Sequence, residues 1–252
     1  DGQTILAAGL QVGLAAHSAS DPSLRGLDAF VGDAGTYAGT ATNEGLIRAL
    51  RGSVAITGRN VNQLGAIDSS TSVSLNGRID LRAEYGAIAN QKFNPVLSDT
   101  SPPFLYGGLG AEKSTGQVTI GPGSVMRILP EWGSADKVIG TSLALRSQVN
   151  ARGRIVHFGP DAMLQAPNGN VTVQTGVWDL DGPQNRTAFV RNSGQIYVER
   201  DTLISVAGTT DAPSPLSNHI LTVTLRSSEL ADSPLQRTSF FRGGDITVDL
   251  RK

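Results

Sequence analysis

The amino-acid sequence predicts an all-β protein, a right-handed parallel β-helix with loop insertions, and three observations support this prediction. Apolar and polar residues alternate along most of the chain, which is typical of short strands with one buried face. A short phrase that begins with glycine recurs along the chain. Related segments also recur at a shift of about one coil, which indicates a stacked repeat.

The recurring phrase consists of a glycine, a polar residue and an apolar-x-apolar triplet. It begins at Gly52, Gly77, Gly116, Gly153, Gly169, Gly194 and Gly244. We interpret each glycine as a corner, because a corner bends the chain sharply without room for a bulky side chain. The triplet then forms one wall of a coil, with its Val, Ile or Leu side chains facing inward.

The spacing of related segments predicts the length of a coil. "NEGLIRA" from Asn43 and "QLGAIDS" from Gln63 align with a shift of 20, and another segment passes from Gly153 to Gly169 in 16 residues. Stacked coils lie about 4.8 Å apart, so like residues form ladders in register. A β-sandwich would also alternate, but it would have longer strands and hairpins and would not need like residues to recur at one coil length.

Four stretches interrupt the pattern and are predicted to be insertions. They are residues 89–115, 129–150, 178–192 and 207–218. The second fits a short helix, and residues 227–240 fit a helical turn or cap ended by Pro234. Insertions on a repeat scaffold project from its surface and carry function, so we expect partner contacts there.

Charge and composition exclude several classes of protein. The formal net charge is −1 and 17% of the residues are charged, so no basic field is present to attract nucleic acid or an anionic membrane. No run of eighteen apolar residues occurs, so we expect no membrane span. The chain has no cysteine, which excludes disulfides and thiol chemistry and suits a protein exported before it folds.

The sequence carries no motif for a nucleophile, a metal ion or a nucleotide, so we predict no catalytic residue and no cofactor. We expect His157 to be an outward polar residue. Three carboxylate pairs can in principle act as acid and base or bind Ca²⁺. They are Asp80 with Glu84, Asp179 with Asp181, and Glu199 with Asp201. We interpret them as solvated surface charges.

Aromatic residues gather in the predicted insertions, namely Phe104, Tyr106, Trp132 and Trp178. Such rings either stack on a sugar or pin a loop back onto the coil, and we favour pinning. The residues that we single out for contact with a glycan or a partner are Trp132, Trp178, Asp179 and Asp181.

Residues 41–83 resemble the repeats of filamentous haemagglutinin-type exoproteins of Gram-negative bacteria. The resemblance lies in an N-x-G-x-I-x-A pattern, followed by G-x-V-x-[IL]-x-G and again by G-x-[IL]. Here these positions are Asn43, Gly45, Ile47, Ala49, Gly52, Val54, Ile56, Gly58, Gly65 and Ile67. "LADSPLQR" and "GGDITVDLR", within residues 230–251, also look like segments of these proteins.

The resemblance implies a structural and adhesive shaft segment that presents its loops to a host or neighbouring cell. It implies secretion to the cell surface through an outer-membrane two-partner pore protein, and a cell-surface receptor or glycan as partner. Members of the family also deliver toxins or acquire haem. We expect residues 1–252 to be a single β-helical segment of a longer exoprotein, since no Met or signal peptide precedes Asp1.

The alternative is a carbohydrate-active β-helix, either a polysaccharide hydrolase or lyase or a glycan binder. It predicts that Asp179 with Asp181, or Glu199 with Asp201, converge in a groove near Trp178. Carboxylates that are scattered and solvated would speak against this alternative.

Overall fold

The computed structural model describes residues 2–17, 24–32, 39–94, 102–106, 114–134, 146–181, 186–191, 193–210, 216–225 and 242–251. These residues form an all-β structure, with one 3-10 helix at Leu216–His219 and no α-helix. Within them, no helix has the length and apolar character needed to cross a membrane.

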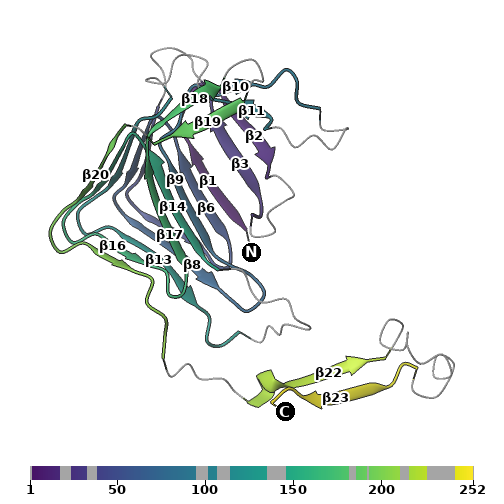
Figure 1. The fold of residues 1–252 in the computed structure, drawn as a ribbon. Coiled ribbons are helices and arrows are strands. Elements are labelled where there is room, and N and C mark those ends of the chain that lie inside the picture. Colours follow the sequence, from purple (N-terminus) through teal and green to yellow (C-terminus); the bar gives the residue numbers. More distant parts are fainter. Residues whose placement is uncertain are drawn as a thin grey trace.

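Three parallel sheets of five strands each make up the main body (Figure 1). Sheet A contains, in spatial order, β1 (Gln3–Ala7), β6 (Ser53–Thr57), β9 (Arg78–Arg82), β14 (Gln148–Gly153) and β17 (Asn170–Thr175). Sheet B contains β4 (Thr40–Asn43), β7 (Asn60–Gln63), β12 (Gln117–Ile120), β15 (Ile155–Phe158) and β20 (Gln195–Val198). Sheet C contains β5 (Leu46–Ala49), β8 (Ala66–Thr71), β13 (Val125–Pro130), β16 (Met163–Gln165) and β21 (Leu203–Ser205).

The chain visits the three sheets in a fixed cyclic order. A strand of sheet A is followed by one of sheet B, then one of sheet C, and the next strand of sheet A pairs in parallel with the previous one. We call each passage through the three sheets a coil. Every coil therefore adds one strand to each sheet, as Figure 1 shows for β6, β9, β14 and β17.

Side chains of like character stack in register inside the coils. In sheet A, Val54, Ile79, Val149 and Val171 are successive register partners. The first three of these are almost fully buried, and sheets B and C supply similar ladders through Val118 and Ile67. A cluster of buried Val, Ile, Leu, Met, Phe and Ala side chains from all three sheets fills the interior. Burial of these side chains stabilises the stack, because each coil supplies one apolar wall to its neighbour.

The register confirms one predicted repeat and corrects another. Ile47 pairs with Ile67, so the shift of 20 is the length of a coil at that point. Gly153 ends a strand of sheet A and leads into sheet B, whereas Gly169 leads into sheet A. The 16 residues between them are therefore part of one coil rather than a repeat, because two different corners carry the same glycine signal.

The glycine phrase marks corners at six of its seven positions. Three phrases lead into sheet A and three into sheet B. The seventh, at Gly244, leads into β23 (Asp245–Asp249), which pairs antiparallel with β22 (Ile220–Thr224) in a separate two-stranded sheet. The prediction that this phrase lies in a coil is therefore wrong for the pairing that the structure describes.

Close approach between coils explains the glycines at two corners, Gly116, which opens one of these phrases, and Gly65, which precedes β8. A Cβ atom on Gly116 would lie 1.7 Å from the carbonyl oxygen of Arg59. One on Gly65 would lie 2.2 Å from the carbonyl oxygen of Gly45. A side chain at either corner would push adjacent coils apart. Gly194 has φ of +108°, a conformation that favours glycine for a different reason.

Two of the predicted insertions contain regular structure where we expected loops. Within residues 89–115, Phe104–Leu105 (β11) pairs antiparallel with Ile88–Ala89 (β10). Within residues 178–192, β18 (Val177–Asp181) and β19 (Arg186–Val190) form a hairpin. The helix expected in residues 129–150 falls largely on residues 135–145, which lie outside the described part of the chain. The turn expected at residues 227–240 lies entirely outside it.

Replacing Ile79 by Asp tests the inward register. Ile79 is fully buried between Val54 and Val149, so its replacement places a carboxyl group without a partner in an apolar interior. We expect the free energy of unfolding to fall by about 3 kcal/mol or more. Urea denaturation followed by circular dichroism measures this change. The matched control is Thr119→Asp, on the outward side of β12, and an equal loss in both variants would contradict the register.

Candidate functional site

Three antiparallel hairpins leave the coils at one and the same corner, between sheet A and sheet B. The first consists of β2 (Val12–Ala16) and β3 (Leu27–Val31) and lies between β1 and β4. The second, β10–β11, lies between β9 and β12, and the third, β18–β19, lies between β17 and β20. Figure 1 shows the three hairpins gathered at one end of the sheets. We call this assembly the hairpin corner.

The hairpins occur at every second coil. At the intervening coils the same corner is tight, with two residues between β6 and β7 and one between β14 and β15. Two coils advance about 10 Å along the axis, which is also the width of a pair of strands. Hairpins at alternate coils therefore have the room to lie next to one another.

Aromatic contacts join the three hairpins into one surface. Phe30 of the first hairpin stacks on Phe104 of the second with ring centroids 4.9 Å apart. Tyr106, which follows β11, stacks on Trp178 of the third at 5.2 Å. Trp178 also meets Phe189 edge-on at 5.3 Å, and the guanidinium of Arg152 lies over the Phe189 ring at 4.9 Å. Contacts of this kind stabilise by about 1 kcal/mol each, so they fix the relative positions of the hairpins.

Hydrogen bonds connect the end of the insertion at residues 89–115 to the third hairpin. The backbone N–H of Trp178 donates to Ser114 Oγ at 2.9 Å, and Thr115 Oγ1 donates to the carbonyl of Gly176 at 2.7 Å. Gly13 of β2 leaves space for the Phe104 ring, because a Cβ atom there would lie 2.2 Å from it. The hairpin corner is thus a connected unit built from segments far apart in the sequence.

The hairpin corner exposes large apolar side chains. On the first hairpin and the turn before it these are Leu10, Val12, Leu14 and Leu27, and on β10 it is Ile88. Leu10 and Leu14 are 68% and 54% exposed. Apolar side chains grouped on a surface mark a place where another molecule binds. A hollow of about 260 Å³ lies between β2–β3 and β10–β11, lined by Gln11, Phe30 and Phe104 among others.

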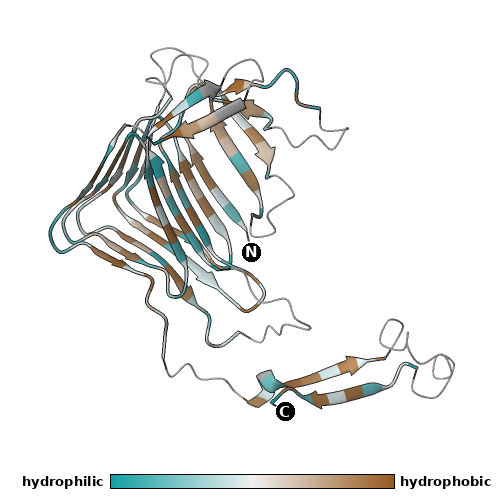
Figure 2. Ribbon diagram, in the orientation of Figure 1, coloured by the Kyte–Doolittle hydropathy of each residue, from teal (hydrophilic) through white to brown (hydrophobic). Residues whose placement is uncertain are grey.

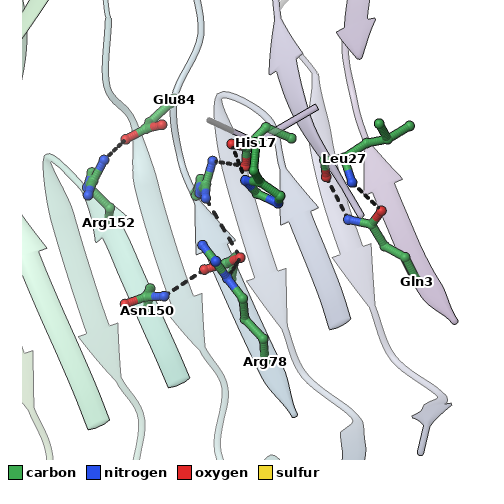
Figure 3. Close-up of polar contacts among 10 residues, drawn as sticks. Gln3, His17, Leu27, Arg78, Glu84, Asn150 and Arg152 are labelled. Atoms are coloured by element: carbon green, nitrogen blue, oxygen red, sulfur yellow. Dashed lines mark hydrogen bonds and ion pairs between the residues drawn. The ribbon is translucent and has the colours of Figure 1, made fainter. Parts of the chain in front are cut away.

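A buried network of charges lies beneath the first hairpin, on the outward side of sheet A (Figure 3). Asp80 contacts Arg78 Nε at 2.6 Å and accepts a hydrogen bond from Asn150 Nδ2 at 2.8 Å. Arg82 reaches from Asp80 to Asp28 of β3, at 3.7 and 2.7 Å. The ion pairs thereby connect the hairpin to the sheet.

Two members of this network correct a prediction. Asp80 and Glu84 are 4% and 2% exposed, so they are not solvated surface charges. Glu84 is paired with Arg152 at 3.4 Å. For Asp80 the prediction was wrong because the first hairpin covers this face of sheet A, where Asp28 of β3 is paired with Arg82. Glu84 lies after β9 at the corner, where it forms a bridge with Thr115 and pairs with Arg152. Alternation along one strand does not reveal what packs on its outward side.

The network changes the ionisation of its members. Burial disfavours the charged form of Asp80, but the guanidinium groups of Arg82 and Arg78 outweigh burial, so the pKa of Asp80 lies below its usual range. Burial also opposes the charge on Arg82, yet Asp80 and Asp28 raise the pKa of that guanidinium. Burial, and then Glu84, raise the pKa of Tyr106 well above its usual value.

The predicted contact residues near the third hairpin behave differently from one another. Trp178 is partly buried and packs on Tyr106, which agrees with the expectation that such rings pin the insertions. Asp179 follows it on β18 and is exposed. Asp181 pairs in register with Arg186, and its side chain lies outside the described part of the structure.

Trp132 lies at a second place, away from the hairpins. It is 45% exposed and lines a groove of about 330 Å³ beside the corner between sheets C and A. Polar side chains in the groove include Ser72, Glu131, Arg146 and Asn168. Glu131 is held by Arg51 Nε at 2.8 Å and by the Ser70 hydroxyl. An exposed indole beside fixed polar groups is a surface on which a ring-shaped ligand can stack.

The remaining carboxylates are placed on other elements. Glu199 pairs with His157 Nε2 at 2.6 Å on the outward side of sheet B, where the His157 side chain is partly exposed. Asp201 is exposed at a turn with φ of +59°. In the part of the chain that the structure describes, no group of three or more His, Asp or Glu side chains is close enough to hold a metal ion.

Sequence reasoning missed the first hairpin, which supplies most of the exposed apolar side chains named above for the hairpin corner. Val12 and Leu14 alternate with small residues in the way that coil strands do, so nothing marked them as an insertion. The signal that could have revealed it was the spacing along the sequence, since β1 is separated from β4 by far more residues than one corner of a coil needs.

Comparisons with known protein families, with curated proteins and with solved structures found no match to this chain.

Replacing Asp80 by Asn tests the buried network. The change removes the negative charge that pairs with Arg78 and Arg82, while the side chain keeps nearly the same volume. We therefore expect the free energy of unfolding to fall by about 3 kcal/mol at pH 7. The lowered pKa of Asp80 means that its contribution is present above the unfolded value of about 3.9 and is lost as the pH falls through the folded value. The difference between the two proteins should therefore shrink below about pH 4.

Denaturant midpoints measured between pH 2.5 and 7 check this expectation. Asp179→Asn, which removes an exposed carboxylate, is the control and should track the unchanged protein. A deficit of Asp80→Asn that is independent of pH would contradict the role assigned to its charge.

Proposed function

We propose that this chain is a structural and adhesive shaft segment of a secreted or cell-surface bacterial exoprotein of the filamentous haemagglutinin type. In this proposal the coils form a stiff support, and the hairpin corner contacts a protein receptor on a host or neighbouring cell. The observation that carries it is the assembly of three insertions at one corner, held together by aromatic contacts and bearing exposed Leu10 and Leu14.

The coils themselves are proposed to be a right-handed parallel β-helix. Three parallel sheets visited in cyclic order support this view. Right-handedness follows from the general preference of parallel crossover connections for that hand. A stack of this kind gains stability coil by coil and gives a rod suited to holding a binding surface away from a cell.

Export through an outer-membrane two-partner pore protein belongs to the same proposal. The absence of cysteine supports it, because a disulfide formed in the periplasm would hinder passage through a pore. The resemblance of residues 41–83 to exoprotein repeats supports it as well. No catalytic step is part of this function.

Binding to whole cells tests the adhesive role. We expect the purified, fluorescently labelled chain to be retained on cultured epithelial cells or on Gram-negative bacterial cells, and Leu14→Lys to lower retention about tenfold. The change places a charge on an exposed apolar surface, where it costs little folding stability but opposes apolar contact. Flow cytometry measures the retained label.

The matched control is Leu50→Lys, the same change at a residue 48% exposed in the turn between β5 and β6. Equal loss in both variants, or no retention of the unchanged protein on either cell type, would count against the hairpin corner as an adhesive surface.

A second candidate function is glycan binding without turnover, at the groove beside Trp132. The exposed indole and the fixed Glu131 carboxylate are the observations that favour it. Sugars are bound in this way by stacking on an aromatic face while neighbouring polar groups bond the hydroxyls.

Intrinsic fluorescence checks this candidate. We expect an oligosaccharide library applied to the protein to include members that change the emission of Trp132, and Trp132→Ala to abolish their binding. Trp178→Phe, which alters the partly buried indole of the hairpin corner, should leave binding intact. An oligosaccharide whose affinity is unchanged by Trp132→Ala would exclude the groove as its site.

A further inference from the structure

The last coil exposes side chains that equivalent coils bury. Strands β17, β20 and β21 are the terminal strands of sheets A, B and C. Ile196 and Val198 of β20 are 48% and 56% exposed, whereas their register partners Val156 and Phe158 are buried. An unpaired strand edge above an apolar interior is a template for the addition of further strands.

The C-terminal hairpin β22–β23 carries apolar residues without a cover of their own. Register partners on this hairpin are Leu221 with Val248 and Val223 with Ile246. Ile246 and Val248 are more than two-fifths exposed, and Figure 2 shows apolar positions along both strands. A two-stranded hairpin with such a face is at best marginally stable in water, so these residues favour a larger sheet.

The order of strands along the chain assigns β22 and β23 to particular sheets. Every described strand of sheet C except the last is followed by one of sheet A, and then by one of sheet B. Strand β21 belongs to sheet C, and the next strands in the chain are β22 and β23. The order thus predicts β22 on the free edge of β17, and β23 on the free edge of β20.

The sequence places both strands in the same register. Leu221 follows Val171 of β17 by 50 residues, and Ile246 follows Ile196 of β20 by the same 50. The shift aligns apolar positions in both pairs of strands and aligns Gly194 with Gly244, the glycines that open the recurring phrase. One shift that satisfies two sheets at once is the pattern that a complete coil requires.

The connections have lengths that these corners already accommodate. From β21 to β22 there are 14 residues, and from β13 to β14, across the same corner, there are 17. From β22 to β23 there are 20, and from β17 to β20 there are 19. The connection from β22 to β23 would place an insertion in the coil directly after the one that bears β18–β19, so it would depart from the alternation of hairpins and tight corners in the first five coils.

We propose that the open end of the stack binds β22 and β23 of the same chain as parallel strands, β22 on β17 and β23 on β20. The antiparallel hairpin and this coil are then alternative pairings of the same two strands. The coil covers the exposed side chains of β20 and leaves a new pair of edges for a further coil. This inference concerns the end of the stack and is independent of any binding at the hairpin corner.

Engineered disulfides distinguish the two pairings, because the natural chain has no cysteine. Thr172→Cys with Thr222→Cys reports the coil in sheet A, and Tyr197→Cys with Thr247→Cys reports it in sheet B. Thr222→Cys with Thr247→Cys reports the hairpin, in which these two hydroxyl oxygens lie 3.4 Å apart. The chain is expressed in full, oxidised at low concentration, alkylated and mapped by mass spectrometry.

We expect both coil pairs to oxidise within a single chain, at least tenfold faster than the hairpin pair. Oxidation confined to the hairpin pair would overturn the proposal. Disulfide-linked dimers formed by the coil pairs would also overturn it, since they would show that the open end accepts strands from a second copy.

Hydrogen exchange provides a test without crosslinks. In the coil, Ile246 faces the interior above Ile196, so Ile246→Asp should speed amide exchange in β20 about tenfold or more. Thr247→Asp, outward in the coil, is the control and should leave β20 unchanged. If Ile246→Asp leaves exchange in β20 unaltered, β23 does not cover that strand and the proposal fails.

Discussion

Parallel pairing of each strand with its equivalent one coil away is the constraint on which the rest of this structure depends. Because Val54 pairs with Ile79 and Ile79 with Val149, the interior side chains of all coils must stay in register. A slip of one residue would turn an entire apolar row outward. This requirement also explains corners such as Gly116, where the backbone of the neighbouring coil leaves no room for a Cβ atom.

The corner between sheets A and B differs in length from one coil to the next without changing the stack. Hairpins between sheets A and B do not disturb the ladders, since the chain returns to the register that it left. Charged groups that would be costly in the coil interior instead lie beneath the first hairpin, where Asp80, Arg82 and Asp28 compensate one another. The same stack therefore supports the hairpin corner from outside, while mainly apolar side chains fill its interior.

Repetition has a second consequence, at the end of the stack. Each coil buries the apolar wall of its neighbour, so the last described coil leaves Ile196 and Val198 exposed, and the chain carries two more strands with matching register. Pairing of β22 and β23 with each other or with β17 and β20 uses the same alternating residues. The competition between these pairings arises because a pattern of period two does not specify its partner.

The sequence by itself determined the all-β class, the short strands and the shift of 20 that pairs Ile47 with Ile67, because ladders and corners act through local alternation and glycine. It also placed Trp178 in an insertion. Only the tertiary structure decided that Asp80 and Glu84 are buried, that Trp132 borders a groove, and that Val12 and Leu14 belong to a hairpin rather than a coil. Alternation along one strand indicates which side chains share a face of the sheet. Which segment covers that face depends on residues far away in the chain.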